Sequence, residues 1–372
     1  MPIFINDLFE LLKKLVIFIL IVAIAIPLYY GSTNPTYLTI RVLHSILSLK
    51  HTILPDPARA PVSAGYHAFQ DLIRMNPIAE FDRTADPLTM IKEQRAAFAA
   101  SEILPKLSSC KINKEVFEYN GHTVDAYWIN NHQNKFQRKS DKIILYFHGG
   151  GYMLGDIHSY ERFECHLSHL FNTTFLHVEY RLCPEYPMPA AVEDTVALYR
   201  ALLRENILPS QLIIMGDSAG GGLSLLSIQA LITQGLPIPH GLIALSPMVD
   251  LSASGESYKR NRLTDIMVSP DNSEWMIRQV LGPNHSQLSP KSPIFSPLFG
   301  SFKGFPPMYI NVGTAELLED EGRLVVKKAQ EAGVDVTLEE GLYMMHIYPI
   351  FFLYYPEARN TLDNINKWIQ TN

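Results

Sequence analysis

The sequence predicts an α/β fold in which an open, mostly parallel sheet is covered by helices on both faces. Short, continuous apolar runs recur along the chain, helical patterns lie between most of them, and two of the runs lead directly into glycine-rich turns. A strand that is buried on both faces requires such an apolar run, and parallel neighbours require a crossover connection, usually a helix. Ligands of such sheets bind at the carboxyl ends of the strands.

The composition excludes several classes of protein. The chain has 372 residues with 31 Lys and Arg against 37 Asp and Glu, a net charge of −6. This length is sufficient for a large core, and the charge argues against a nucleic-acid partner. Charged residues make up only 18% of the chain, below the roughly 25% that is typical of soluble domains. An apolar segment has therefore been added to an otherwise ordinary domain.

The first predicted unit, residues 1–33, contains that apolar segment. Residues 15–30 read LVIFILIVAIAIPLYY, without a charge, directly after Lys13 and Lys14. About 20 apolar residues span a bilayer, and apolar residues upstream of the two lysines can extend the segment. We expect a retained single-pass membrane anchor, whose balanced flanking charges leave its orientation open. A signal peptide cleaved near Ala23-Ile24-Ala25, which gives a secreted or periplasmic enzyme, is one alternative. A buried or cap helix is another.

The elements after this segment follow in order. Residues 34–110 are rich in proline and partly helical, and we expect them to form a helical cap. Residues 111–372 form the predicted catalytic domain, which opens with two antiparallel edge strands at 111–119 and 123–129. The apolar runs of the sheet are 143–147, 174–178, 212–215, 242–245, 308–312 and 336–338. An insertion at about 250–304, rich in Ser, Pro and Asn, is long enough to be functional and is predicted to complete the cap.

The sharpest motif is Gly216-Asp217-Ser218-Ala219-Gly220. It follows the apolar run 212–215 and opens a helical pattern. A Gly-x-Ser-x-Gly between strand and helix is a nucleophile elbow, in which the serine hydroxyl stands exposed at the sheet edge. Glycines flank the serine because the turn is strained and the helix crosses close to the strand. We therefore predict Ser218 as a catalytic nucleophile.

A second glycine-rich turn, His148-Gly149-Gly150-Gly151-Tyr152, follows the run 143–147. Acyl transfer passes through an oxyanion that requires preorganised N–H donors, and consecutive glycines expose such amides. Neither Lys nor Ser/Thr closes the motif, which excludes a nucleotide phosphate loop. Upstream of an elbow, the turn is typical of an oxyanion loop.

The chain resembles the hormone-sensitive-lipase family of α/β-hydrolases, the branch of microbial esterases and arylacetamide deacetylase. The resemblance rests on HGGGY at 148–152, EYRLCPEYPMPAAVED at 179–194, GDSAGGG at 216–222 and LSPMVDLS at 245–252. It implies an α/β-hydrolase fold and an oxyanion hole formed by the backbone amides of Gly150, Gly151 and Ala219. It also implies that His148 has a structural role and is not the catalytic base. By the same resemblance, Arg181, Glu185 and Asp194 pair structurally beneath the oxyanion loop.

The catalytic base is predicted from chain order, which in this fold runs Ser, acid, His. Downstream of Ser218 the histidines are His240, His285 and His346. His240 precedes a strand, and His285 lies in the insertion. His346 follows the run 336–338 and reaches the carboxyl edge of the sheet, so we predict it as the base. The family has His-Gly-Phe there, whereas this chain has His346-Ile347-Tyr348.

The acid is the member of the triad with two candidates. The family has Asp-Pro-Leu-x-Asp-Glu after the strand equivalent to 308–312, and this chain has Glu316-Leu317-Leu318-Glu319-Asp320-Glu321. The resemblance therefore gives Glu316 as the acid, and α/β-hydrolases use either Asp or Glu. Asp320 is the competitor, although its position suits a charge in the first turn of a helix.

These residues predict a membrane-anchored carboxylic-ester hydrolase that acts on a small-molecule ester through an acyl-enzyme. No cofactor is expected, and the three cysteines lack the spacing of a zinc site. Deacetylation of amides or steryl esters by the same triad is the nearest alternative. An inactive small-molecule receptor and a membrane-bound interaction protein are two others, but the histidine position is filled, which disfavours a receptor.

Overall fold

The computed structural model describes residues 25–26, 28–75, 86–99, 103–130 and 142–372. The predicted anchor at 15–30 therefore lies largely outside the described residues. None of the helices within the described ranges combines the length and apolar character needed to cross a bilayer. The anchor and its orientation stay predictions.

All eight predicted strands are present and form one sheet in the order β1-β2-β4-β3-β5-β6-β7-β8. The strands are β1 (Ile112–Tyr119), β2 (His122–Ile129), β3 (Ile143–Phe147), β4 (Thr174–Glu179), β5 (Leu212–Asp217), β6 (Gly241–Leu245), β7 (Met308–Gly313) and β8 (Val336–Gly341). β2 runs antiparallel to both β1 and β4, and the remaining pairs are parallel. The fold is that of an α/β-hydrolase, as the resemblance implied.

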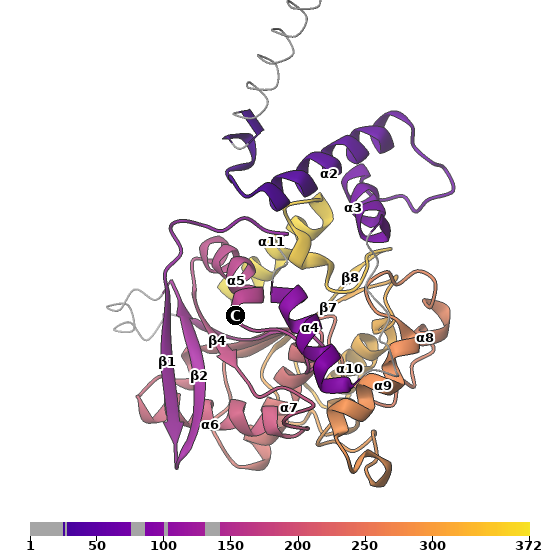
Figure 1. Ribbon diagram of the computed structural model, residues 1–372. Coiled ribbons are helices and arrows are strands. Elements are labelled where there is room, and N and C mark those ends of the chain that lie inside the picture. The colour runs from indigo at the N-terminus through magenta and orange to yellow at the C-terminus, as the bar shows by residue number, and fades with distance from the viewer. Residues whose placement is uncertain (1–24, 27, 76–85, 100–102, 131–141) are drawn as a thin grey trace, which may run out of the picture.

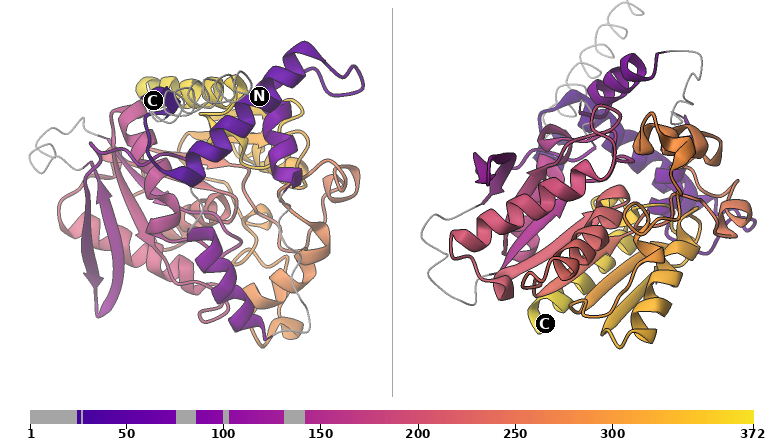
Figure 2. Two further views of the ribbon diagram at one scale, coloured as in Figure 1. Left: turned by 45° about the horizontal axis from the view of Figure 1, so that its top comes forward. Right: turned by 90° about the horizontal axis from the view of Figure 1, so that it is seen from below.

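The central strands β3 to β7 are apolar because each separates two cores. Along β3, Ile143, Leu145 and Phe147 belong to one cluster of buried side chains, whereas Ile144 and Tyr146 belong to the other. The first core lies under the helices α6 (Ala190–Arg204), α7 (Ala219–Thr233) and α10 (Glu319–Glu331). The second lies under α5 (Ile157–Phe171) and α11 (Pro356–Thr371). Figures 1 and 2 show these two layers of helices with the sheet between them.

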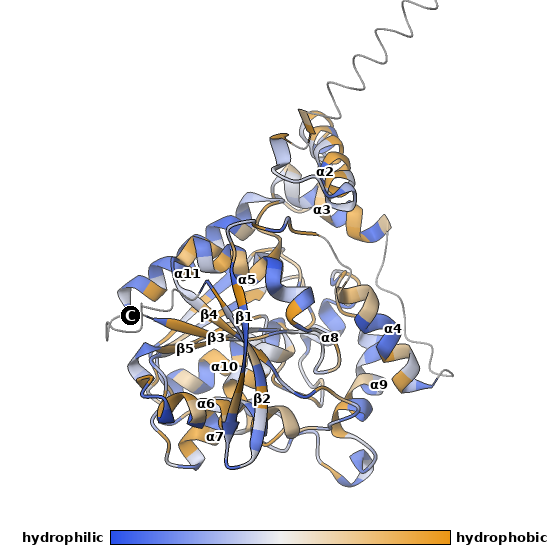
Figure 3. Ribbon diagram, turned by 60° about the vertical axis from the view of Figure 1, so that its left-hand side comes forward, coloured by the Kyte–Doolittle hydropathy of each residue, from blue (hydrophilic) through white to orange (hydrophobic). Residues whose placement is uncertain are grey.

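Five further α-helices of the described residues lie outside these two layers. They are α2 (Pro35–Ile53), α3 (Ala64–Met75), α4 (Pro87–Ala99), α8 (Ser257–Arg260) and α9 (Pro270–Leu281). The last two belong to the predicted insertion between β6 and β7, and α4 lies beside them in Figure 1. α2 and α3 instead lie together near α11, and Figure 3 shows them at one end of the molecule. The division into cap and catalytic domain stays a prediction, but α2–α4 occupy two separate places.

Candidate active site

Ser218 stands at the turn between β5 and α7. Its backbone adopts φ +52° and ψ −119°, a conformation that costs free energy for a residue with a side chain and is maintained by its surroundings. The flanking glycines permit this turn, because a Cβ on Gly220 would lie 1.9 Å from the Phe147 carbonyl oxygen and one on Gly216 would lie 2.4 Å from the Gly220 carbonyl oxygen. The predicted elbow therefore has a steric basis.

His346 lies in the loop after β8, and its Nε2 is 2.9 Å from Ser218 Oγ. The two residues are 128 positions apart in the sequence, and the fold brings them together because both follow parallel strands of one sheet. The imidazole is only 4% exposed. A hydroxyl within hydrogen-bond reach of an imidazole is the arrangement that general-base activation of a serine requires.

Glu316 lies in the loop between β7 and α10 and is fully buried. Its Oε2 is 3.3 Å from His346 Nδ1, an ion-pair distance, and accepts a hydrogen bond from Ser246 Oγ at 2.7 Å. The same Ser246 oxygen accepts from the Ile347 amide at 3.0 Å. One hydroxyl thus connects the Glu316 carboxylate to the loop after β8 that carries His346, which we call the histidine loop.

Asp320 faces a different part of the molecule. Its carboxylate accepts a hydrogen bond from the Ser257 amide at 2.7 Å and pairs with Arg260 at 2.7 Å. Asp320 lies in the first turn of α10, where a negative charge is favourable. The structure thus brings Glu316, and not Asp320, to the histidine.

The electrostatics of the site favour a protonated imidazole. Burial alone would lower the pKa of His346, but the Glu316 carboxylate, with smaller contributions from Asp265 and Asp217, raises it above its ordinary value of 6.5. Burial raises the pKa of Glu316, and this effect is opposed by His346 and by the Ser246 hydroxyl. A nearby anion stabilises the charge that forms on His346 when it takes a proton from the serine.

The predicted oxyanion loop has three amides in position to donate. Gly150 and Gly151 have positive φ values of 112° and 64°, which glycine adopts without strain. Ala219 is the first residue of α7, where the amide has no partner within the helix. Throughout the described part of the chain, no group accepts a hydrogen bond from these three amides.

A buried carboxylate fixes the start of this loop. Asp217, which is fully buried, accepts hydrogen bonds from the Gly149 amide at 3.0 Å, from Tyr146 at 2.7 Å and from Tyr160 at 2.9 Å. Sequence analysis did not assign Asp217 a role, although an acid at the end of an apolar strand needs buried partners. Asp217 thus joins the turn that carries Ser218 to the predicted oxyanion loop.

His148 packs beneath the loop. Its ring stacks on Tyr180 with centroids 4.3 Å apart, and Tyr180 donates a hydrogen bond to the His148 carbonyl oxygen at 2.7 Å. Burial lowers the pKa of His148 to about 4, so the ring is neutral at physiological pH. Its Nδ1 is 2.8 Å from the Gly149 carbonyl oxygen. These contacts agree with a structural role.

The residues predicted to pair structurally beneath the loop all form ion pairs, one of them with a partner from outside the motif. Arg181 pairs with Asp194 at 2.8 Å, and Glu185 pairs with Arg95 of α4 at 2.7 Å. Arg95 also donates to the carbonyl oxygens of Met153 and Cys183 at 2.7 and 2.9 Å. The partner of Glu185 is 90 residues away in the sequence, in a segment without a recognisable motif, and so could not be predicted.

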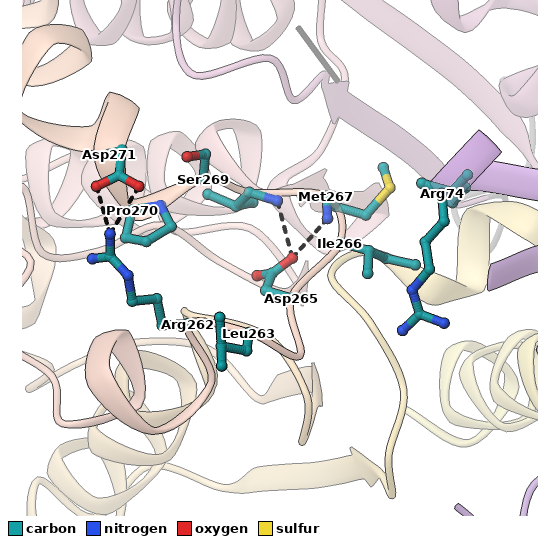
Figure 4. A pocket seen from close by; sticks show the side chains of 11 residues that line it. Arg74, Arg262, Leu263, Asp265, Ile266, Met267, Ser269, Pro270 and Asp271 are labelled. Atoms are coloured by element: carbon teal, nitrogen blue, oxygen red, sulfur yellow. Dashed lines mark hydrogen bonds and ion pairs between the residues drawn. The ribbon is translucent and has the colours of Figure 1, made fainter. Parts of the chain in front are cut away.

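The loop that carries Glu316 is held by the insertion. Asp265 accepts a hydrogen bond from the Leu317 amide at 2.8 Å, and Asn261 donates one to the Glu316 carbonyl oxygen at 2.8 Å. Asp265 also lines a cavity of about 470 Å³, which Figure 4 shows between Arg74 of α3 and the segment 262–271. Ser218 is not among the residues that line this cavity.

Among the residues that the structure describes, the cysteines and histidines do not converge on a metal site. Cys165 forms a disulfide with Cys110, which joins the segment before β1 to α5. Ligand atoms of His148, His177 and Glu179 lie within 4.8 Å of one another. The two rings stack nearly parallel, at 9°, so their in-plane lone pairs do not converge. His177 is instead paired with Glu164 at 2.6 Å.

Comparison with known proteins finds relatives that are named as hydrolases and esterases. Residues 144–350 match the model of a family described as having the alpha/beta hydrolase fold. The chain is 34% identical over 251 residues to an acetyl-hydrolase of Streptomyces hygroscopicus, covering 68% of this chain and 81% of the relative. It is 32% identical over 234 residues to an esterase of Acinetobacter venetianus, covering 63% and 76%.

Solved structures resemble the chain over a larger share of its length. An esterase from the bacterial hormone-sensitive lipase family is 31% identical and superimposes with a TM-score of 0.71, covering 84% of this chain and 99% of that one. The esterase EstE5, in a crystal soaked with p-nitrophenyl butyrate, is 30% identical with the same coverage and a TM-score of 0.73.

Proposed function

Because the chain belongs to the hormone-sensitive-lipase family of α/β-hydrolases and is a hydrolase of the esterase type, we propose that it cleaves carboxylic esters with the triad Ser218, His346 and Glu316. The observation that carries the proposal is the 2.9 Å contact between Ser218 Oγ and His346 Nε2. The relatives named esterases support a small-molecule ester as substrate.

The proposed reaction has two half-reactions. His346 takes the Ser218 proton as Oγ attacks the ester carbonyl, and the amides of Gly150, Gly151 and Ala219 stabilise the oxyanion. Collapse of this intermediate breaks the bond to the alcohol, which leaves with the proton from His346. Water then attacks the acyl-enzyme with His346 again as base, and the acid product leaves as Ser218 regains its proton.

Glu316 is the proposed acid because its carboxylate is aimed at the nitrogen of His346 that faces away from Ser218. An acid at this position holds the imidazole in the tautomer that accepts a proton at Nε2. The contact of 3.3 Å is longer than an ordinary hydrogen bond, and catalytic contacts of free enzymes often shorten when substrate binds. Ser246 keeps the carboxylate in place in the meantime.

The same family resemblance supports deacetylation as a second candidate. The relative from Streptomyces hygroscopicus is named an acetyl-hydrolase, and removal of an acetyl group uses the same acyl-enzyme. We also propose that residues 15–30 retain the enzyme at a membrane, because the segment is apolar and without charge.

A panel of p-nitrophenyl esters from acetate to palmitate, together with an acetanilide, tests both candidates. The full chain should hydrolyse esters, and Ser218→Ala should not. Ser224→Ala is a matched control, because Ser224 lies in the same helix and donates its hydroxyl to the Gly220 carbonyl oxygen. A fluorophosphonate should label the wild type and Ser224→Ala but not Ser218→Ala. Normal turnover by Ser218→Ala would refute the proposal.

A further inference from the structure

The outer face of α2 carries a row of apolar side chains, of which Leu38 and Val42 are half-buried and the other three are exposed. Leu38, Val42, Ile46, Leu49 and Ile53 follow one another at spacings of four, four, three and four residues, which places them on one side of a helix. Ile46, Leu49 and Ile53 are 59, 60 and 65% exposed. Figure 3 shows hydrophobic colour along α2, at the edge of the molecule. Single exposed apolar residues are ordinary, but a contiguous row marks an interaction surface.

The inner face of α2 accounts for its attachment without this row. Tyr37, His44 and His51 are buried on that side. His44 Nε2 is 2.9 Å from the Gly65 carbonyl oxygen, and His51 Nε2 is 2.8 Å from Asp71 Oδ2. These contacts fix the rotation of α2 against α3, so the apolar row stays directed outward.

The sequence around this face indicates what covers it. α2 has no Asp or Glu, and its Lys50 is exposed, so no negative charge opposes an anionic membrane surface. Arg41 is directed to the protein body instead, where it donates a hydrogen bond to the Leu353 carbonyl oxygen. The charge-free segment 15–30 ends five residues before α2 begins at Pro35. Within that segment, Leu28 and Tyr29 are 77 and 82% exposed, and tyrosine is enriched at membrane interfaces.

We propose that the outer face of α2 lies in the interface of a lipid bilayer, in addition to any anchor that precedes it. A helix of this kind rests parallel to the membrane with its apolar face roughly 5 to 10 Å into the headgroup region. The proposal does not depend on the esterase activity, because it concerns a surface distant in sequence from Ser218.

Docking through α2 would hold the histidine loop close to the membrane. α3 lies between the two, since α2 packs on α3 and Tyr66 of α3 donates a hydrogen bond to the Tyr343 carbonyl oxygen at 3.1 Å. Tyr343 is three residues before His346. An esterase held in this way would take substrate that partitions into the lipid phase.

Depth-dependent fluorescence quenching tests the surface in the full chain. Leu49→Cys would carry a thiol-reactive fluorophore in vesicles of phosphatidylcholine and phosphatidylglycerol, some with brominated acyl chains as quencher. The native cysteines should not react, because Cys110 and Cys165 form a disulfide and Cys183 is buried. Ile294→Cys is a matched control, since Ile294 is 56% exposed and lies in the insertion.

We expect the brominated lipid to quench most of the fluorescence of the label at position 49. The fluorescence of the label at position 294 should not change. Adding Ile46→Ser and Ile53→Ser to the labelled chain should abolish the quenching while ester hydrolysis and Tm stay unchanged. Three results would overturn the proposal: an unquenched label at 49 in vesicle-bound protein, quenching that survives the two serine substitutions, or disulfide cross-linking of position 49 between copies without quenching. The last would show that a second copy covers α2.

Discussion

Replacing Glu316 with glutamine is the sharpest test of the proposed triad, because it removes a charge and little else. The amide has nearly the shape of the carboxylate and can still accept the hydrogen bond from Ser246, which lies 2.7 Å away. What is lost is the anion 3.3 Å from His346 Nδ1. The histidine should stay near Ser218, so substrate binding and KM should change little.

The expected loss is in kcat. The equivalent Asp-to-Asn change in a serine protease lowers kcat about 10⁴-fold, which corresponds to roughly 5 kcal/mol of transition-state stabilisation. Both partners of the present pair are buried, Glu316 fully and His346 with 4% exposed, so solvent screening is weak and a loss of about 10³- to 10⁴-fold is expected. Steady-state kinetics with p-nitrophenyl acetate would measure it.

The pH profile provides a second reading of the same change. His346 acts as a base only when neutral, and its pKa is raised above 6.5, since the neighbouring carboxylates outweigh the effect of burial. The kcat/KM of the wild type should therefore fall as the pH drops through a value above 6.5. Without the Glu316 charge, burial is less opposed, so the residual activity of Glu316→Gln should fall at a lower pH than in the wild type.

Asp320→Asn is the matched control, four residues further along the chain. It weakens the contacts with Arg260 and Ser257, and a charge in the first turn of a helix contributes about 0.3 to 1 kcal/mol of stability. Tm should fall slightly while kcat stays near normal. If Asp320→Asn were inactive and Glu316→Gln nearly normal, the assignment of the acid would be refuted.

Two further predictions concern the supports of the site, and a third concerns the N-terminal segment. Asp217→Asn should lower kcat about 10²-fold, the size of effect expected when one oxyanion donor is lost, because Asp217 holds the Gly149 amide next to the proposed donors Gly150 and Gly151. Unchanged kcat in a folded variant would contradict this role. Arg95→Ala should lower the free energy of unfolding by about 1 to 3 kcal/mol in urea denaturation, because hydrogen bonds made by a charged group are lost. Arg95→Lys should not restore the stability, because a lysine lacks the planar guanidinium that donates to several acceptors at once. If residues 15–30 are a retained anchor, the full chain should stay in the membrane fraction after an alkaline carbonate wash. A mature N-terminus near Ile26, found by mass spectrometry, would instead indicate that a signal peptide has been cleaved.

The strands could be predicted because their composition follows from their position. Every central strand separates two cores, so each must be apolar on both sides, and such runs are visible without knowledge of their neighbours. The elbow was equally visible, since the steric demand of the turn falls on residues adjacent to Ser218. Even the antiparallel strands β1 and β2 followed from local alternation, although β2 lies between β1 and β4 and, of the two, only β1 is at an edge of the sheet. In each case the physical cause lies within a few residues of its effect.

The supports of the site could not be predicted because their causes are distant. Asp217, Ser246 and Asp265 matter through partners that are 68, 70 and 52 residues away. A buried polar group needs a partner, but the sequence does not say which group provides it. The places of α2 and α4 were similarly hidden, because each is set by its contacts with distant parts of the chain.

The two acid candidates show why the distinction needs the fold. Glu316 and Asp320 are four residues apart in one acidic stretch, and chain order allows either. What separates them is the start of α10 at Glu319. Before it, the loop leaves β7 at the carboxyl edge of the sheet and directs Glu316 inward to His346; after it, the first turn of the helix directs Asp320 to Arg260 of the insertion. Asp265 of the insertion accepts a hydrogen bond from the Leu317 amide, two residues before this boundary. In the proposed triad, the choice of acid therefore depends on the point at which a helix begins, and the insertion contacts the chain just before that point.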